Sequence, residues 1–338
     1  MKGVIGSLVL AALLLSGCSG GAPEPTTPKG TEEAPKTAPK KDKLKIALLT
    51  PGPVSDAGWS AMAYNGLMFV QEQLGGEVQS QQAASDTQIR DAMRSYAQKG
   101  FDLVIGHGYE YNEPGVEVAK DFPGTFFVSS SGGKTSANAG AFRFALEEGF
   151  YLAGMTGAMM SKTGKLAMIG GPDVPSIRST FKAFRAGAES VKPGITVIET
   201  FTGKNDDIAA ANQATLKAIE QGADMVIHQA NAAAQGVFDA CKEKKVWAFG
   251  ANANQNDNKS GVVVGSAVIN AGPAFLALAT KVKEGTYHGG IETMTMAGNT
   301  IDFVFNDKIA VPVDVKTKID ATRADIKAGK IAVPMDKF

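Results

Sequence analysis

Residues 44–76 read LKIALLTPGPVSDAGWSAMAYNGLMFVQEQLGG, which predicts a strand, a loop and a helix in succession. The opening run is short and apolar, as expected of a strand buried on both faces. The sequence Pro-Gly-Pro ends the strand, and apolar residues then recur at helical spacing from Trp59 onward. In a parallel α/β sheet, ligands bind beside loops that leave the carboxyl ends of strands. Ser55, Asp56 and Trp59 are therefore candidate ligand contacts.

These three residues also allow a second interpretation. Ser55 or Asp56 would cap the following helix, and Trp59 would be a core residue on its first turn. Capping by one polar residue would still leave the other, together with the indole, to face a ligand. The sequence keeps both interpretations open.

The N-terminal residues predict export and a lipid anchor. Residues 1–17 carry a positive charge followed by an apolar run that is too short to span a bilayer. The sequence Leu15-Ser16-Gly17-Cys18 is similar to a bacterial lipobox, and this similarity implies that Cys18 becomes a lipidated, palmitate-bearing N-terminus. An ordinary signal peptide with an incidental cysteine is the alternative. Residues 18–43 are rich in Pro, Thr and Lys and predict a disordered tether. We expect an extracytoplasmic protein, anchored to a membrane of the bacterial cell envelope.

Composition excludes some functions for the rest of the chain. The 34 basic and 34 acidic residues give a formal net charge of zero, and no basic stripe carries interleaved aromatic residues. Nucleic acid is therefore not an expected partner. Cys241 is the only other cysteine, so no disulfide framework is expected, and we interpret its thiol as a core group. The length left after the tether is enough for two lobes with separate cores.

Strand and helix patterns alternate along this length, which predicts two α/β lobes with parallel sheets and right-handed crossovers. The first lobe is assigned to residues 44–145, with about 268–290 returning to it. The second lobe is assigned to 146–267, and 291–338 is left unassigned between the lobes. Predicted helices cover about 86–99, 112–121, 175–191, 207–221, 232–244 and 271–284. Asp86 is the expected cap of the first, and Asp206 is the expected cap of the helix at 207–221, with Asp207 as its first-turn partner. No full strand is expected around Gly140, and Trp247 is predicted to be core.

The predicted strand ends deliver aromatic rings and neutral amides to a cleft between the lobes. Such side chains suit a flat, uncharged, hydrogen-bonding ring, because aromatic faces stack and amides match donors and acceptors. The candidate ligand-binding residues are Ser55, Asp56, Trp59, His107, Tyr109, Phe181, Gln229, Asn231, Asn252 and Asn254.

Signatures of catalysis are absent from the sequence. There is no G-x-S-x-G elbow, and the Gly-Lys-Thr at 133–135 lacks the first glycine of a phosphate loop. His107 and His228 have no third ligand or carboxylate pair placed beside them, so no metal is expected. We predict no catalytic residue and no cofactor, and an enzyme that uses His107 is the less favoured alternative.

The chain resembles the basic membrane protein family, the purine-nucleoside-binding lipoproteins of ABC importers. The resemblance rests on PVSDAGW, GFDLVIGHGYEYNEPGVEVAKDFPGTFFV, EEGFYLAGMTGAMMSKTGKLAMIGG, the helix after Pro175, VFDACKEKKVWAFGANANQND and AGKIAVP, in this order. It implies a type I periplasmic-binding-protein fold with a hinge and a central cleft, an ABC permease as partner, and no enzymatic activity. It also implies that Trp59 stacks on the purine, that Phe181 closes over the base, and that Asp56 or a neighbour bonds its edge. We expect a monomer.

Two departures from the family bear on the ligand. Nucleoside binders carry an aspartate where this chain has Asn252 and a lysine where it has Ile269. The forms PVSDAGW and GYEYNEP are closer to the branch thought to bind free nucleobases. We therefore favour a free purine-type base and keep a nucleoside as the alternative. A sensor of the same fold and a binder of another flat heterocycle also remain open.

Overall fold

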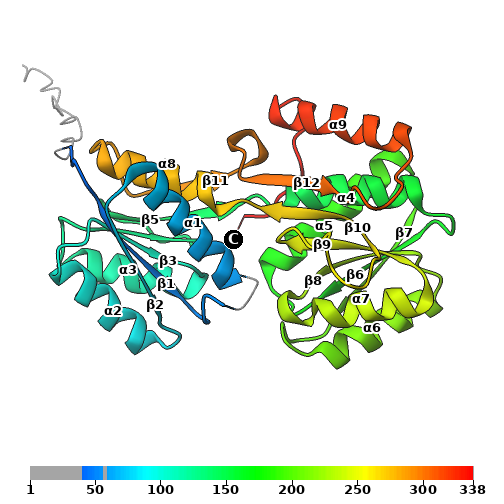
Figure 1. Cartoon of the computed structure of the whole chain (residues 1–338), viewed down its shortest axis with the longest axis horizontal. Helices are drawn as coiled ribbons and strands as arrows, with labels where there is room; N and C mark the ends of the chain where they lie inside the picture. The colour runs from blue at the N-terminus through cyan, green and yellow to red at the C-terminus, as the bar shows by residue number, and fades with distance from the viewer. Residues whose placement is uncertain (1–39, 56–58, 338) are drawn as a thin grey trace, which may run out of the picture. The chain divides into compact units, whose positions relative to one another are not determined.

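The computed structural model describes residues 40–55 and 59–337. These residues form two sheets of mostly parallel strands with helices on both faces (Figure 1). Every neighbouring pair in the first sheet is parallel. In spatial order its strands are β11 (Ile291–Met294), β5 (Ala139–Phe144), β4 (Phe126–Ser129), β3 (Leu103–Gly106), β1 (Lys45–Thr50) and β2 (Glu77–Gln82).

The second sheet repeats this order with one change of direction. Strands β10 and β12 pair antiparallel, and the other neighbours are parallel. In spatial order its strands are β12 (Ile301–Phe305), β10 (Val263–Ile269), β9 (Trp247–Asn252), β8 (Met225–Gln229), β6 (Lys165–Gly170) and β7 (Thr196–Phe201).

The central strands are apolar on both faces because helices cover both sides of each sheet. In β1, Ile46 and Leu48 pack in the core beneath α1 (Trp59–Leu74) and α8 (Ala271–Lys283). The intervening Ala47 and Leu49 pack in the opposite core, beneath α2 (Asp86–Gln98) and α3 (Asn112–Ala119). One core of the second lobe lies under α4 (Glu147–Met160), α5 (Pro175–Val191) and α9 (Val313–Lys327), the other under α6 (Ile208–Glu220) and α7 (Ala234–Lys244).

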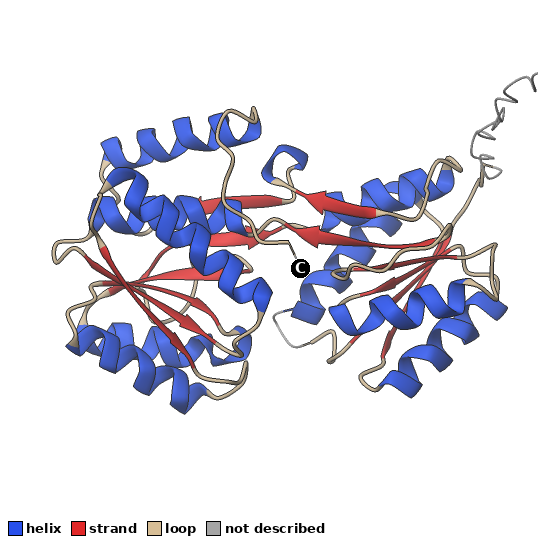
Figure 2. Cartoon of the chain, turned by 180° about the vertical axis from the view of Figure 1, so that it is seen from behind, coloured by secondary structure: helices blue, strands red, loops and turns tan. Residues whose placement is uncertain are grey.

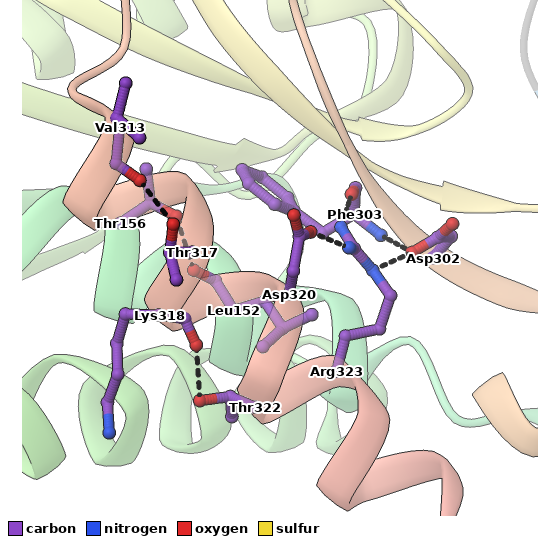
Figure 3. Close-up of polar contacts among 10 residues, drawn as sticks. All are labelled: Leu152, Thr156, Asp302, Phe303, Val313, Thr317, Lys318, Asp320, Thr322 and Arg323. Atoms are coloured by element: carbon purple, nitrogen blue, oxygen red, sulfur yellow. Dashed lines mark hydrogen bonds and ion pairs between the residues drawn. The ribbon is translucent and has the colours of Figure 1, made fainter.

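Helix α9 belongs to the second lobe, although the sequence left its segment unassigned. It runs along α4 beside β12, and Arg323 fastens it there (Figure 3). Arg323 donates from Nε to Oδ1 of Asp302 at 2.8 Å and from Nη2 to the carbonyl of Phe303 at 2.6 Å. It also pairs with Asp320 on its own helix.

Within the described residues the chain passes between the lobes three times, from β5 to α4, from β10 to α8 and from β11 to β12. The C-terminal residues lie beside these crossings (Figure 2). The carbonyl of Asp336 accepts from Nη1 of Arg143, on β5, at 2.6 Å, and its N–H donates to Oγ of Ser179, on α5, at 2.9 Å. The tail is thus bonded to both lobes.

Several local predictions were wrong. Residues 139–144, around Gly140, form the full strand β5. The cap of α2 is Ser85, whose hydroxyl accepts from the backbone of Gln88, and Asp86 is the first helical residue. Trp247 opens β9 and is 39% exposed. The cap of α6 is Asp207, whose side chain accepts from the backbone of Ala210, and not Asp206.

Helices α4 and α5 cross closely through glycines. A Cβ atom on Gly154 would lie 2.0 Å from the carbonyl oxygen of Phe184, and one on Gly187 would lie 2.0 Å from that of Tyr151. Backbone atoms cannot yield to a methyl group as a flexible side chain can.

We therefore expect Gly154→Ala to lower the free energy of unfolding by at least about 2 kcal/mol, since the two helices would have to separate. Chemical denaturation measures the change. Gly124→Ala is the matched control, because nothing lies within 4 Å of its added Cβ. Equal stability of the two variants would contradict the close packing of α4 on α5.

Candidate functional site

A cavity of about 430 Å³ lies at the carboxyl ends of the strands of both sheets. Each sheet reverses its strand order beside β1 and β6, and such reversals open a crevice between neighbouring loops. From the first lobe the lining includes Pro51, Trp59, Gly108, Tyr109, Glu110, Ser131, Arg143 and Phe144. From the second lobe and the strand crossings it includes Leu146, Glu147, Pro172, Val174, Ser176, Ile177, Thr180, Asn205, Gln229, Asn231, Asn252 and Ile269.

Trp59 stands on the first turn of α1 and stacks on His107, with ring centroids 3.9 Å apart and planes 23° apart. Its Nε1–H donates to the carbonyl of His107 at 3.1 Å. The ring of Phe144 meets the indole edge-on at 6.3 Å. One indole face is therefore covered, and a ligand in the cavity would stack on the opposite face.

His107 supports Trp59 from behind and does not line the cavity. It is fully buried, and its Nδ1 lies 2.9 Å from Oγ of Ser130. The carboxyl end of β3 thus supplies a buried ring that holds the indole, followed by Tyr109, which lines the cavity and is 71% exposed.

The side-chain amides of Asn231 and Asn252, in the second lobe, are positioned by a mutual hydrogen bond and by left-handed backbone conformations. Nδ2 of Asn252 donates to Oδ1 of Asn231 at 2.9 Å. Both residues adopt left-handed conformations, with φ of 67° and 44°, which asparagine tolerates better than most residues. This hydrogen bond uses Nδ2 of Asn252 and Oδ1 of Asn231. The other two amide atoms, Nδ2 of Asn231 and Oδ1 of Asn252, can therefore contact a ligand beside Gln229.

Half of the ten predicted ligand-binding residues meet at this cavity. Trp59, Tyr109, Gln229, Asn231 and Asn252 all line it. Asn254 lines a neighbouring cavity of about 400 Å³ between α1 and the loop after β9. Ser55 is exposed and is not part of the lining. Asp56 and Cys18 lie outside the described residues.

The structure corrects the position expected for Phe181. Its side chain is 1% exposed and packs in the core of the second lobe against Phe150 and Phe201. It faces inward because it lies on the apolar stripe of α5. Val174, Ile177 and Thr180 line the cavity from this segment in its place.

Sequence reasoning missed the charged pair at the base of the cavity. Arg143 is the residue before the end of β5, and Glu147 is the first residue of α4. Their side chains, which are 15% and 1% exposed, form an ion pair. The two residues are four apart in the sequence, but one lies on a strand and the other on a helix. The rule that predicts ion pairs between residues i and i+4 applies within a helix, so it did not predict this pair. A third charged residue, Glu110, lines the rim.

His228 has a structural role. It is fully buried, its Nε2 lies 2.8 Å from Oε1 of Gln255, and its Nδ1 accepts from the N–H of Ala230 at 3.4 Å. Burial lowers the pKa of His228 to about 4, and the bond to Gln255 offsets only part of this shift. The neutral ring fixes the loop after β9, because the same Gln255 oxygen accepts from the N–H of Ala251 at 2.9 Å.

No group of three or more His, Cys, Asp or Glu side chains in residues 40–55 and 59–337 could hold a metal ion. Within the same residues, no helix has both the length and the apolar character needed to cross a membrane.

A family model described as ABC transporter substrate-binding protein PnrA-like, named Bmp, matches residues 43–337. A purine-binding protein of Brucella abortus is 28% identical over 295 residues, covering 86% of this chain and 83% of the relative. The transcriptional activator protein med of Bacillus subtilis is 28% identical over 284 residues, covering 82% of each. An ABC transporter nucleoside-binding protein of Lactococcus lactis is 28% identical over 320 residues, covering 87% and 90%.

Solved structures agree with the fold. A solute-binding protein of an ABC transporter system from Conexibacter woesei superposes with a TM-score of 0.74 at 24% identity, covering 86% of this chain and 99% of that one.

The pKa of His228 predicts acid-sensitive stability. The unfolded chain binds a proton near pH 6.5 and the folded chain only near pH 4. Stability is therefore complete above about pH 7 and falls as the pH drops through this window, by about 2 kcal/mol between pH 7 and pH 5. Denaturant titrations at several pH values measure the slope.

His228→Gln should be less stable at pH 7 and should lose this part of the slope. His288→Gln, at an exposed position, serves as the control and should keep the slope. An unchanged slope in His228→Gln would contradict the assignment.

Proposed function

Because the chain belongs to the Bmp family of ABC transporter substrate-binding proteins, we propose that it captures a purine-type ligand for an import permease, a free base in preference to a nucleoside. As a binding protein of such a transporter it is not an enzyme. The names of two relatives, a purine-binding protein and a nucleoside-binding protein, support a ligand of this class.

One observation carries the proposal. The indole of Trp59 is stacked on His107 on one face and lines a cavity whose opposite wall presents neutral amides. The Trp59 face offers a stacking surface, and the stack on His107 keeps it from turning away. Gln229, Asn231 and Asn252 offer donors and acceptors from the opposite lobe. A flat heterocycle uses both, because it stacks through its face and hydrogen-bonds through its edge.

The charges of the lining support a neutral ligand without phosphate. Glu110 and Glu147 are the acidic lining residues, and Arg143 is the basic one among the described residues. The guanidinium of Arg143 is engaged by Glu147 and by the carbonyl of Asp336. An anionic phosphate would thus meet two carboxylates and an arginine that is already bonded.

The lining also favours a base over its nucleoside. Asn252 and Ile269, which stand where the resemblance implies charged contacts to ribose, both line this cavity. Neither side chain is charged, so the sugar would lose two strong hydrogen-bonding partners.

The proposed mechanism is capture by lobe closure. A ligand that bonds both walls favours the conformation in which the walls are closest, and the crossings between the lobes serve as the hinge. The permease would recognise the closed form. We further propose that a lipid on Cys18 holds the protein, as a monomer, at the outer side of a membrane.

A sensor is the second candidate, since one relative is named a transcriptional activator. In that case the closed form would be read by a regulatory partner. Copurification with a permease favours transport over sensing.

Removing the indole should weaken binding. We expect Trp59→Ala to cost about 1 to 3 kcal/mol of binding free energy for the cognate base, by loss of stacking. Trp59→Phe should retain part of it, since a ring face remains. Calorimetric titration with purine bases and their nucleosides, side by side, gives these values and the ligand class together.

The chain provides a matched control in its only other tryptophan, Trp247. This residue opens β9 at the end of the strand remote from Asn252, so Trp247→Ala should bind as the wild type does. Equal affinity of Trp59→Ala and the wild type would contradict the stacking assignment. Failure of the wild type to bind any purine would overturn the ligand class.

A further inference from the structure

Glu147 is a buried carboxylate at the base of the cavity. It is the first residue of α4, directly after the crossing from β5, and it lines the cavity although its side chain is only 1% exposed. No role was predicted for this residue.

The two oxygens of this carboxylate have different surroundings. Oε1 accepts from Nη2 of Arg143 and from Oγ of Ser179, the latter at 2.5 Å. Oε2 is buried and has no hydrogen-bond partner among the described residues. A buried carboxylate oxygen without a donor is costly, and such an exception in a binding site calls for a missing donor.

We propose that Oε2 of Glu147 accepts a hydrogen bond from a ring N–H of the bound base, and that this contact selects ligands with such a donor. The inference rests on the proposed function and adds a residue that determines specificity. The ion pair with Arg143 places a guanidinium beside this carboxylate, and hydrogen bonds to charged acceptors are stronger than those to neutral ones.

The chemistry of the ligand follows from this acceptor. A free purine carries an imidazole N–H, and a nucleoside has replaced that hydrogen with the sugar. A carboxylate that bonds this N–H would reject the nucleoside, in agreement with the neutral Asn252 and Ile269. Other ring N–H groups could fill the same role, so the test has to vary the position of the donor.

Glu147→Gln changes one atom of the carboxylate and also removes the charge that pairs with Arg143. In Glu147→Gln the amide oxygen keeps the place of Oε1, because both partners there, Arg143 and Ser179, are donors. The amide NH₂ then takes the place of Oε2, and an acceptor becomes a donor. Shape and packing are nearly conserved.

Glu148→Gln is the matched control. Glu148 is the next residue of α4 and is also buried, but its Oε2 accepts from the N–H of Met296 at 2.5 Å, and it does not line the cavity. It therefore tests the loss of a buried carboxylate on the same turn without touching the ligand.

The experiment is a calorimetric cycle with the wild type and both variants. The probes are adenine and hypoxanthine, each with its derivatives methylated at single ring nitrogens. We expect Glu147→Gln to weaken the parent base roughly 10- to 100-fold. The derivative methylated at the contacting nitrogen should be weak in the wild type and no weaker in Glu147→Gln, so that the two changes are not additive. Glu148→Gln should leave every affinity unchanged.

Each other outcome is decisive. If the wild type binds purines and Glu147→Gln binds them equally well, this inference is wrong and the proposed function stands. If every methylation is additive with Glu147→Gln, the inference is also wrong. If the wild type binds no purine, both proposals fail.

A crystal structure of the wild-type complex tests the contact without any variant. A ligand nitrogen within about 3.2 Å of Oε2 supports the inference. Contact of Oε2 with an ordered water only, and not with the ligand, overturns it.

Discussion

The strands of a parallel sheet all end at one edge, and in this protein the edges of two sheets face the same space. Most residues that line the cavity lie at the carboxyl end of a strand or in the segment that follows it, from Pro51 after β1 to Ile269 at the end of β10. The side chains available to a ligand are therefore set by strand order, not by nearness in sequence. The loops bear the site, and the helices on the outer faces of the sheets keep the strand ends in register.

The base of the cavity and the chain crossings between the lobes share residues. Arg143 belongs to a crossing strand, Glu147 to the helix that follows it, and Ser179 to the helix packed against that one. The Asp336 backbone bonds to both Arg143 and Ser179. A change in lobe angle would alter distances in this group, while the ligand proposed to contact Glu147 would supply the donor that its Oε2 lacks. In the proposed mechanism, a few polar contacts with little exposure to solvent would connect binding to hinge motion.

The alternation of strands and helices, and with it the type of fold, could be predicted because buried parallel strands are apolar and helices show their own period. Strand β2, with the sequence EVQSQQ, gave no signal because it is an edge strand that is largely exposed. Trp59 and the amides could be predicted from their place after strands. The position expected for Phe181 came from the family resemblance, whereas its place on the apolar stripe of α5 puts its side chain in the core. Two contacts could not be predicted: the hydrogen bond between Asn231 and Asn252, and the ion pair of Arg143 with Glu147. Both depend on distances across loops and crossings, which cannot be inferred from one sequence.

Strand β11 has a consequence for how the chain folds. It completes the first sheet by pairing with β5, with Ile291 opposite Ala141, so the whole second sheet up to β10 lies between the partners in sequence. Such distant pairing raises contact order and slows folding. During synthesis, the edge of β5 stays unpaired until the chain is nearly finished, and unpaired edges invite association with other chains. A late-forming edge of this kind would benefit from chaperone protection, and a fragment that stops before residue 291 would expose it permanently.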